Sequence, residues 1–110
     1  MILERHTQKL AKGVKMETYI EWERKWNGVE KRLGGAPAKR HYWLMAGGED
    51  IGTIIWEREW ESLAAMEAHN EKLYSDPESS NLLAQHSDIL SSERQEFYGV
   101  LPDPEFIAEP

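Results

Sequence analysis

The stretch Ile51–Asn70, IGTIIWEREWESLAAMEAHN, constrains the fold more than any other part of this sequence. Its first half is rich in β-branched and aromatic residues, which predicts a strand that runs to Trp60. Ser62 then suits the N-cap of an amphipathic helix. The inner side of this helix is predicted to carry four residues: Leu63, Met66, Asn70 and Leu73. A strand that passes almost directly into a helix indicates a domain in which helices pack on a sheet.

Two patterns near the N-terminus predict a strand followed by a long helix. Residues Ile2–Leu10 alternate loosely, which predicts a strand with at least one face toward water. After Lys12-Gly13, apolar residues recur every three or four positions and form one helical stripe: Tyr19, Trp22, Trp26, Val29 and Leu33. Charged residues are predicted on the other side of this helix: Glu21, Glu23, Arg24, Lys25 and Lys31. Gly34-Gly35 ends the helix, and Gly28 inside it indicates a kink or a close packing contact.

The rest of the chain predicts a hairpin, a short helix and a last strand. Residues 38–46 are rich in aromatic side chains, and the turn 47–50 joins them to the strand that ends at Trp60. We therefore expect two antiparallel neighbouring strands. A short helix is predicted at 78–85, and a fourth strand at 91–101. The remaining residues, 102–110, contain three prolines and are predicted to form an extended tail.

The element order strand, helix, strand, strand, helix, strand predicts one ferredoxin-like α+β domain over residues 1–101. In this fold the helices cover one face of a four-stranded antiparallel sheet. The predicted third strand nevertheless carries large apolar residues toward both faces, with Ile51 and Ile55 on one side and Ile54 and Trp56 on the other. We therefore expect a homodimer in which a second subunit, related by a two-fold axis, covers the open sheet face.

The composition argues against several classes of partner and chemistry. The formal net charge of -7 does not suit nucleic acid or an anionic membrane surface as the main partner. The absence of Cys excludes disulfides, thiol nucleophiles, iron–sulfur clusters and Cys-ligated zinc. No segment resembles a signal peptide or a membrane span, so we expect a cytoplasmic protein.

The spacing Glu57-x-x-Trp60-x-Ser62-x-x-Ala65-x-x-Ala68-His69 resembles the dimeric α/β-barrel superfamily, as do the element order and the Lys12-Gly13 turn. Within it, the chain resembles antibiotic-biosynthesis-monooxygenase-like and NIPSNAP-like proteins over almost its whole length. Asp76-Pro77 is similar to a dipeptide of the NIPSNAP-like branch. The resemblance implies that two ferredoxin-like sheets pack into a barrel, with a pocket between sheet and helices in each subunit.

The resemblance leaves three functions open. The first is a monooxygenase-like or isomerase-like enzyme that needs no cofactor and acts on a small apolar or aromatic molecule. The second is a non-enzymatic NIPSNAP-like module that binds a small molecule or serves a stress response. The third is a haem-binding barrel that uses His69. Haem-degrading relatives also use an Asn near the first strand, which Ile2–Leu10 lacks, so we expect no cofactor.

Five residues are candidates for ligand binding and one for catalysis. His69 borders the apolar side of its helix and is the candidate proton carrier, with a structural hydrogen bond at the helix–sheet boundary as the alternative. Arg58 shares a strand face with indole rings, where it could bind a ligand carboxylate or pair with a carboxylate across the dimer. The full ligand-binding set is Arg58, His41, Trp43, Trp56 and Tyr98. Its aromatic members are equally typical of a packed interface. The sequence contains no metal-ligand spacing, so no metal site is predicted.

Overall fold

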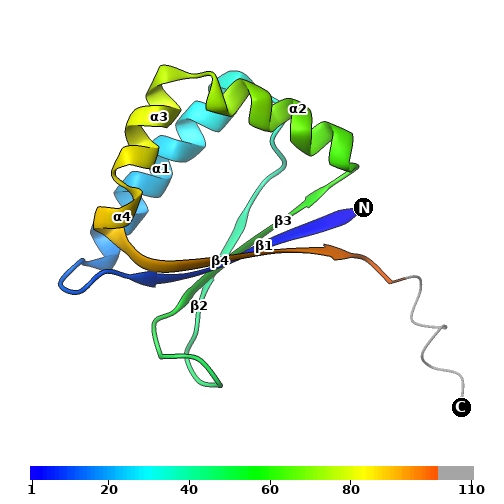
Figure 1. Cartoon of the computed structure of the whole chain (residues 1–110). Helices are drawn as coiled ribbons and strands as arrows, with labels where there is room; N and C mark the ends of the chain where they lie inside the picture. The colour runs from blue at the N-terminus through cyan, green and yellow to red at the C-terminus, as the bar shows by residue number, and fades with distance from the viewer. Residues whose placement is uncertain (102–110) are drawn as a thin grey trace, which may run out of the picture.

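A computed structural model describes residues 1–101, and the predicted extended tail lies outside the described residues. Four strands form one antiparallel sheet in the order β2-β3-β1-β4. Their bounds are β1 Ile2–Leu10, β2 Arg40–Trp43, β3 Ile54–Trp60 and β4 Leu90–Gly99. The helices lie on one face of this sheet (Figure 1). The structure therefore confirms the predicted ferredoxin-like α+β fold.

The helices begin and end where local sequence signals place them. Their bounds are α1 Met16–Leu33, α2 Leu63–Tyr74, α3 Pro77–Ala84 and α4 His86–Ile89. The hydroxyl of Ser62 accepts a hydrogen bond from the backbone N–H of Ala65, which confirms it as the N-cap of α2. Gly34 follows α1 with a φ of 77°, a conformation that side chains rarely allow. Gly28 has no neighbour close to its missing Cβ, so the predicted close packing contact there is wrong.

The main differences from prediction lie at the hairpin and in the helical layer. β2 is only four residues long and its residues are exposed, and β3 starts at Ile54 because the turn continues through Gly52. Ile51 therefore lies in the turn, where it is 79% exposed, rather than on a sheet face. The short helix α4 was not predicted. On α2, Leu63 is exposed and His69 is buried, because the helix turns its His69 side toward the sheet.

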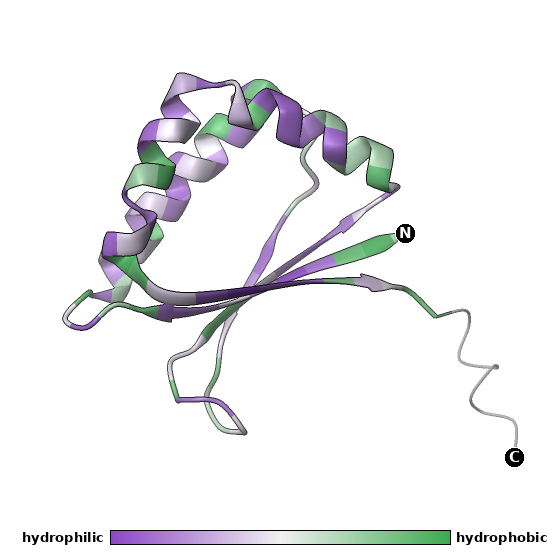
Figure 2. Cartoon of the chain, viewed as in Figure 1, coloured by the Kyte–Doolittle hydropathy of each residue, from purple (hydrophilic) through white to green (hydrophobic). Residues whose placement is uncertain are grey.

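The apolar core lies between α1 and the other helices at one end of the sheet. Its buried members are Tyr19, Trp22, Trp26, Val29, Ile54, Leu73, Leu82, Ile89 and Leu90. In Figure 2, hydrophilic residues continue along the strands beneath the helices. The strand register accounts for this polarity, because it places Glu4 opposite Arg58 and His6 opposite Trp56 on neighbouring strands. The helix-facing side of the sheet thus carries buried polar residues that the core does not include.

The opposite side of the sheet is partly apolar and partly ionic. It carries Leu3, Tyr42, Ile55 and Tyr98, of which Tyr42 and Tyr98 are exposed. The guanidinium of Arg5 lies 2.5 Å from the Glu57 carboxylate. This face therefore has a smaller apolar area than we expected from a strand that carries large apolar residues toward both faces of the sheet. Within residues 1–101, no helix is both long enough and apolar enough to cross a lipid bilayer.

Candidate functional site

His6 of β1 lies buried between the sheet and the helices. Its ring stacks on Trp56 of β3, with 3.9 Å between ring centroids and 12° between planes. Its Nε2 atom lies 2.7 Å from Oε2 of Glu4. Burial alone would raise the pKa of Glu4, but the hydrogen bond from His6, the charge of Arg58 and the indole of Trp60 lower it to about 2. Because Glu4 is ionised and can only accept, Nε2 of His6 is the donor of this bond.

The second ring nitrogen of His6 is the most distinctive atom in this site. Within residues 1–101, no group meets the buried Nδ1 atom with hydrogen-bond geometry. The nearest carboxylate is Glu93 of β4, whose Oε1 lies 3.3 Å away. Burial lowers the pKa of His6, but the hydrogen bond to Glu4 and the charges of Glu93 and Glu4 outweigh it and raise the pKa above 6.5. When neutral, His6 therefore presents an unshared electron pair at Nδ1.

Arg58 of β3 links His6 to the helical layer through two carboxylates. Its Nε donates to Oε1 of Glu4 at 3.0 Å, and its Nη1 donates to Oε2 of Glu30 at 2.7 Å. Its side chain is 5% exposed, and its guanidinium lies over the indole of Trp60, 4.8 Å from the ring centroid. Arg58 thus pairs within its own subunit, and the predicted indole neighbours are confirmed.

Glu30 and Glu23 of α1 continue the ionic chain toward β2. Lys39, which precedes β2, lies 2.7 Å from Glu23 and 3.4 Å from Glu30. Glu23 also lies 3.3 Å from Nε2 of His41. Burial would raise the pKa of both carboxyl groups, but the neighbouring cations and hydrogen bonds lower it. The prediction that Glu23 lies on the outer side of its helix is therefore wrong, because this cation cluster draws it inward.

His69 of α2 completes the network from the other side. Its Nε2 lies 2.8 Å from Oε2 of Glu30, and its Nδ1 lies 3.2 Å from the backbone oxygen of Gly34. Its side chain is 1% exposed. Both ring nitrogens therefore face hydrogen-bond acceptors. This geometry matches the structural alternative given above, and the catalytic role of His69 stays a prediction.

Carboxylates outnumber permanent cations in this network. Four carboxylates meet two permanent cations. The carboxylates are Glu4, Glu23, Glu30 and Glu93, and the cations are Lys39 and Arg58. The two histidines in hydrogen-bond contact with these carboxylates at fully buried positions are His6 and His69. Proton uptake by His6 is therefore coupled to its contacts with Glu4 and Glu93.

A cavity of about 150 Å³ opens beside this network. Its walls come from the sheet and from all four helices. Charged and polar groups on its walls include Glu4, His6, Lys39, Arg58, Glu93 and Gln95. Trp22, Trp26, Trp56 and Leu73 supply its apolar walls. A cavity of about 150 Å³ holds a molecule of the size of benzene. The site therefore suits one ring or a chain of similar volume.

A larger groove of about 410 Å³ lies outside, between α1 and β2. It is mainly apolar, and it contains the predicted ligand-binding residues His41 and Trp43. Trp56 and Arg58 line the inner cavity, and Tyr98 lies on the opposite face of the sheet beside Arg5. The predicted aromatic residues are thus divided among three places. The buried ionisable groups line the smaller cavity, whereas the larger groove is mainly apolar.

Binding of haem by His69 would require a change in the hydrogen bonds of this residue, because it would break one of the two. A cavity of about 150 Å³ is also smaller than the roughly 300–1,000 Å³ of ordinary ligand pockets. Among residues 1–101, no cluster of three or more acidic, His or Cys side chains is arranged to hold a metal ion.

Comparisons with known proteins connect this fold to two groups. No protein-family model matches the sequence, and no curated protein matches it. A NIPSNAP family protein from Agrobacterium tumefaciens superposes with a TM-score of 0.73 at 18% identity, covering 93% of this chain and 92% of that one. An uncharacterised NIPSNAP domain protein from Burkholderia xenovorans gives 0.68 at 15% identity, covering 94% and 100%.

A solved antibiotic biosynthesis monooxygenase gives a TM-score of 0.56 at 15% identity, covering 93% of this chain and 100% of that one. The chain therefore has the ferredoxin-like α+β fold of NIPSNAP family and antibiotic-biosynthesis-monooxygenase-like proteins, as the resemblance implied. At these identities the likeness defines the fold and leaves the chemistry to the site.

Sequence reasoning missed Glu4, His6, Glu23 and Glu30. The signal for the helix pair was present, since Glu23 and Glu30 are seven residues apart and share a helix face with Trp26. Glu4 and His6 alternate with Arg5, so they share a strand face. The polar residues on this face of β1 suggested that it lies toward water. In the structure, residues of β3, β4 and α1 bury it.

Proposed function

We propose that this protein is an enzyme that moves a proton on a small, single-ring-sized organic molecule, with His6 as the general base. The observation that carries this proposal is the buried Nδ1 atom of His6, which has a carboxylate behind the ring and a cavity beside it. A histidine held by a carboxylate through one nitrogen is oriented to accept a proton at the other. An isomerase-like or a monooxygenase-like reaction that begins with proton removal would use the same groups.

The proposed reaction needs two kinds of group in the cavity. Nδ1 of His6 takes a proton from a carbon or oxygen of the substrate, and Glu4 stabilises the resulting imidazolium. The negative charge left on the substrate is stabilised by Arg58 or Lys39, which line the same cavity. Trp56 provides a flat apolar wall for the ring. Proton transfer of this kind requires no cofactor.

Deuterium incorporation into cyclohexane-1,4-dione, measured by NMR in heavy water, tests this function. The wild-type protein should accelerate the exchange of the ring protons next to the carbonyl groups. His6→Gln should reduce the acceleration by about 10²–10⁴-fold, the usual contribution of a general base. Lys72→Gln, at an exposed position of α2 outside the cavity, is the control and should retain the wild-type rate. Circular dichroism confirms that each variant is folded.

The same experiment separates catalysis by His6 from the alternatives. If His69→Gln removes the acceleration while His6→Gln keeps it, His69 is the base and the proposal is wrong. If the diketone binds to the wild-type protein without faster exchange, the protein is a binding module of the non-enzymatic kind. The raised pKa of His6 further predicts that the rate rises with pH above 6.5, as the ring becomes neutral.

We also propose that the protein forms a homodimer through the open face of its sheet. The apolar part of that face is Leu3, Tyr42, Ile55 and Tyr98, and the Arg5–Glu57 ion pair lies among them. Native mass spectrometry should show a dimer, and Ile55→Lys should convert it to a monomer because it buries a charge in the interface. A monomeric wild-type protein would contradict this assembly.

A further inference from the structure

We propose that Glu93, followed by His86, forms the route by which the proton taken by His6 leaves the cavity. This inference rests on the proposed function of His6 as a base. When the proton is not returned to the substrate, the base must release it to water, and the geometry limits where that proton can go. Nε2 of His6 is hydrogen-bonded to Glu4, whose side chain is only 6% exposed. Nδ1 is buried as well, and the carboxylate nearest to it is that of Glu93.

Glu93 is the acidic group placed to receive this proton. One of its oxygens, Oε1, lies 3.3 Å from Nδ1 of His6, and its side chain is 24% exposed. Its other oxygen, Oε2, accepts a hydrogen bond from the side-chain amide of Gln8 at 2.5 Å. The hydroxyl of Tyr19 donates to Gln8 in turn, at 2.6 Å. Glu93 is thus held between the buried base and the surface.

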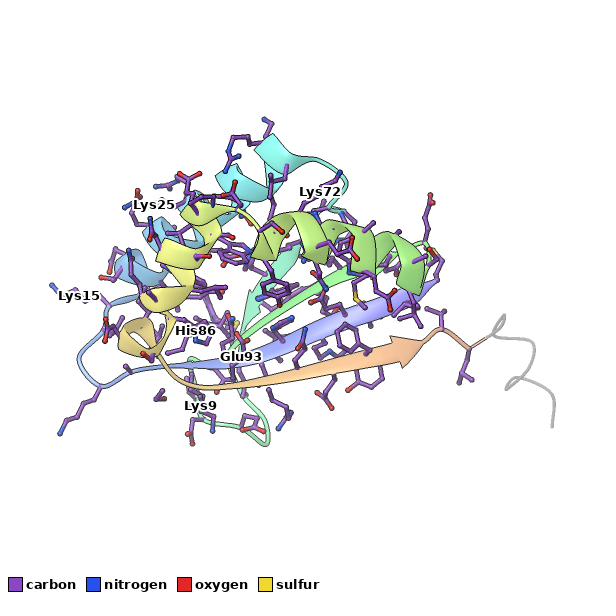
Figure 3. All side chains as sticks on the ribbon, turned by 45° about the horizontal axis from the view of Figure 1, so that its top comes forward. Lys9, Lys15, Lys25, Lys72, His86 and Glu93 are labelled. Atoms are coloured by element: carbon purple, nitrogen blue, oxygen red, sulfur yellow. The ribbon has the colours of Figure 1, made fainter. Side chains whose placement is uncertain are left out.

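His86 of α4 stands at the outer end of this route. Its Nε2 lies 3.3 Å from Oε2 of Glu93, and its side chain is 30% exposed. In Figure 3, His86 and Glu93 lie beside each other where α4 passes into β4. Both residues also line the cavity. One continuous series of side chains therefore runs from the cavity wall to water.

The proton transfer steps balance without any other reactant. The substrate proton binds to Nδ1 and makes His6 an imidazolium. That proton moves to Oε1 of Glu93, which returns His6 to its neutral form and makes Glu93 a neutral acid for a short time. Glu93 then turns its carboxyl group and gives the proton to His86 or to water, which restores its charge. Because the pKa of Glu93 is about 2 and that of His6 is raised, the transfer from His6 to Glu93 is uphill and the release from Glu93 is downhill.

The charged groups around His6 come from every neighbouring strand. Glu4 faces it from β1 and Glu93 from β4, while Arg58 of β3 and Gln95 of β4 bind to Glu4. Glu23 of α1 and Lys39 line the same cavity. Of the two carboxylates that contact His6, Glu93 is the more exposed. Exchange with solvent should therefore depend on Glu93 more than on Glu4.

NMR of histidine-labelled protein without substrate tests this route. The measured quantity is the rate at which the His6 ring exchanges its proton with water, taken for each variant at the pH midpoint of its own His6 titration. Glu93→Gln should slow this exchange by about tenfold or more, because the amide cannot pass a proton on. Glu96→Gln, on the same strand but paired with Arg5 on the opposite face of the sheet, is the control. His86→Gln should slow the exchange by a smaller factor.

Each outcome decides a different part of the proposal. Unchanged exchange in Glu93→Gln, with only a lower His6 pKa, would overturn the route and leave Glu93 as a stabiliser of the imidazolium. Slow exchange in Glu93→Gln with wild-type exchange in His86→Gln would remove His86 from it. Because no substrate is used, failure of the diketone reaction would leave this result standing, and the reverse also holds.

Discussion

Replacing Arg58 with Met is expected to lower the free energy of unfolding by about 3–5 kcal/mol, the usual cost of leaving buried charges without their partner. Arg58 donates to both Glu4 and Glu30, and its side chain is 5% exposed. Met fills much of the same space beside the indoles but leaves both carboxylates without their guanidinium. Urea unfolding followed by tryptophan fluorescence measures the change.

Two further variants make this result specific. Arg24→Met removes a guanidinium that is 69% exposed and pairs with Glu21 one helical turn away, so it should cost less than about 1 kcal/mol. Arg58→Lys should fall between the two, because one ammonium cannot reproduce the planar fork that reaches two carboxylates. A loss below about 1 kcal/mol in Arg58→Met would mean that the ionic chain contributes little to the fold.

The second large effect is acid unfolding. Protonation of Glu4 and Glu93 at low pH should unfold this protein. The pKa of each carboxyl group is about 2 in the folded protein, below the ordinary value of 4.5. The unfolded state therefore binds more protons in this range, and their stabilising contribution is lost as the pH falls from 4.5 toward 2. For the buried Glu4 alone this amounts to about 3 kcal/mol. Unfolding free energies measured across this range give the slope.

His6 acts in the opposite direction at higher pH. Its pKa is raised, so its contribution is complete below pH 6.5 and is lost as the pH rises through the raised value. Stability should therefore be highest between about pH 4.5 and 6.5. Glu4→Gln should flatten the acid slope, while Glu59→Gln, at an exposed position of β3, should leave it unchanged. Stability that keeps rising from pH 6 to 9 would contradict the role assigned to His6.

The fold could be predicted because its signals are local. The alternation of β1 gave its bounds at Ile2–Leu10, and the stripe from Tyr19 to Leu33 marked α1 and its Gly34 end. The hairpin was less accurate. Ile51 has the β-branched side chain of a strand residue, but the turn through Gly52, with a φ of 91°, keeps it out of β3. Turn geometry decided the register there, and apolar character did not.

The site could be predicted only in part because its partners are distant in sequence. The pattern placed Arg58 among indoles, which the structure confirms with Trp56 and Trp60. It could not pair Arg58 with Glu4, 54 residues away, or with Glu30, 28 residues away. A single polar residue on a strand is usually solvated, so the sequence pattern indicated that His6 and Glu4 lie on the surface. Charge pairing across strands, rather than hydropathy, buries them.

The tautomer of His6 is the measurement that tests the central claim most directly. Long-range proton–nitrogen correlation spectra of labelled histidine distinguish a ring protonated at Nε2 from one protonated at Nδ1. The account predicts that, above the His6 pKa, the proton remains on Nε2 against Glu4 and Nδ1 is unprotonated. It also predicts that phenol, whose hydroxyl can donate to Nδ1, shifts that nitrogen signal while toluene does not. A neutral ring protonated at Nδ1, or a signal that phenol leaves unchanged, would contradict the assignment of His6 as the base in this cavity.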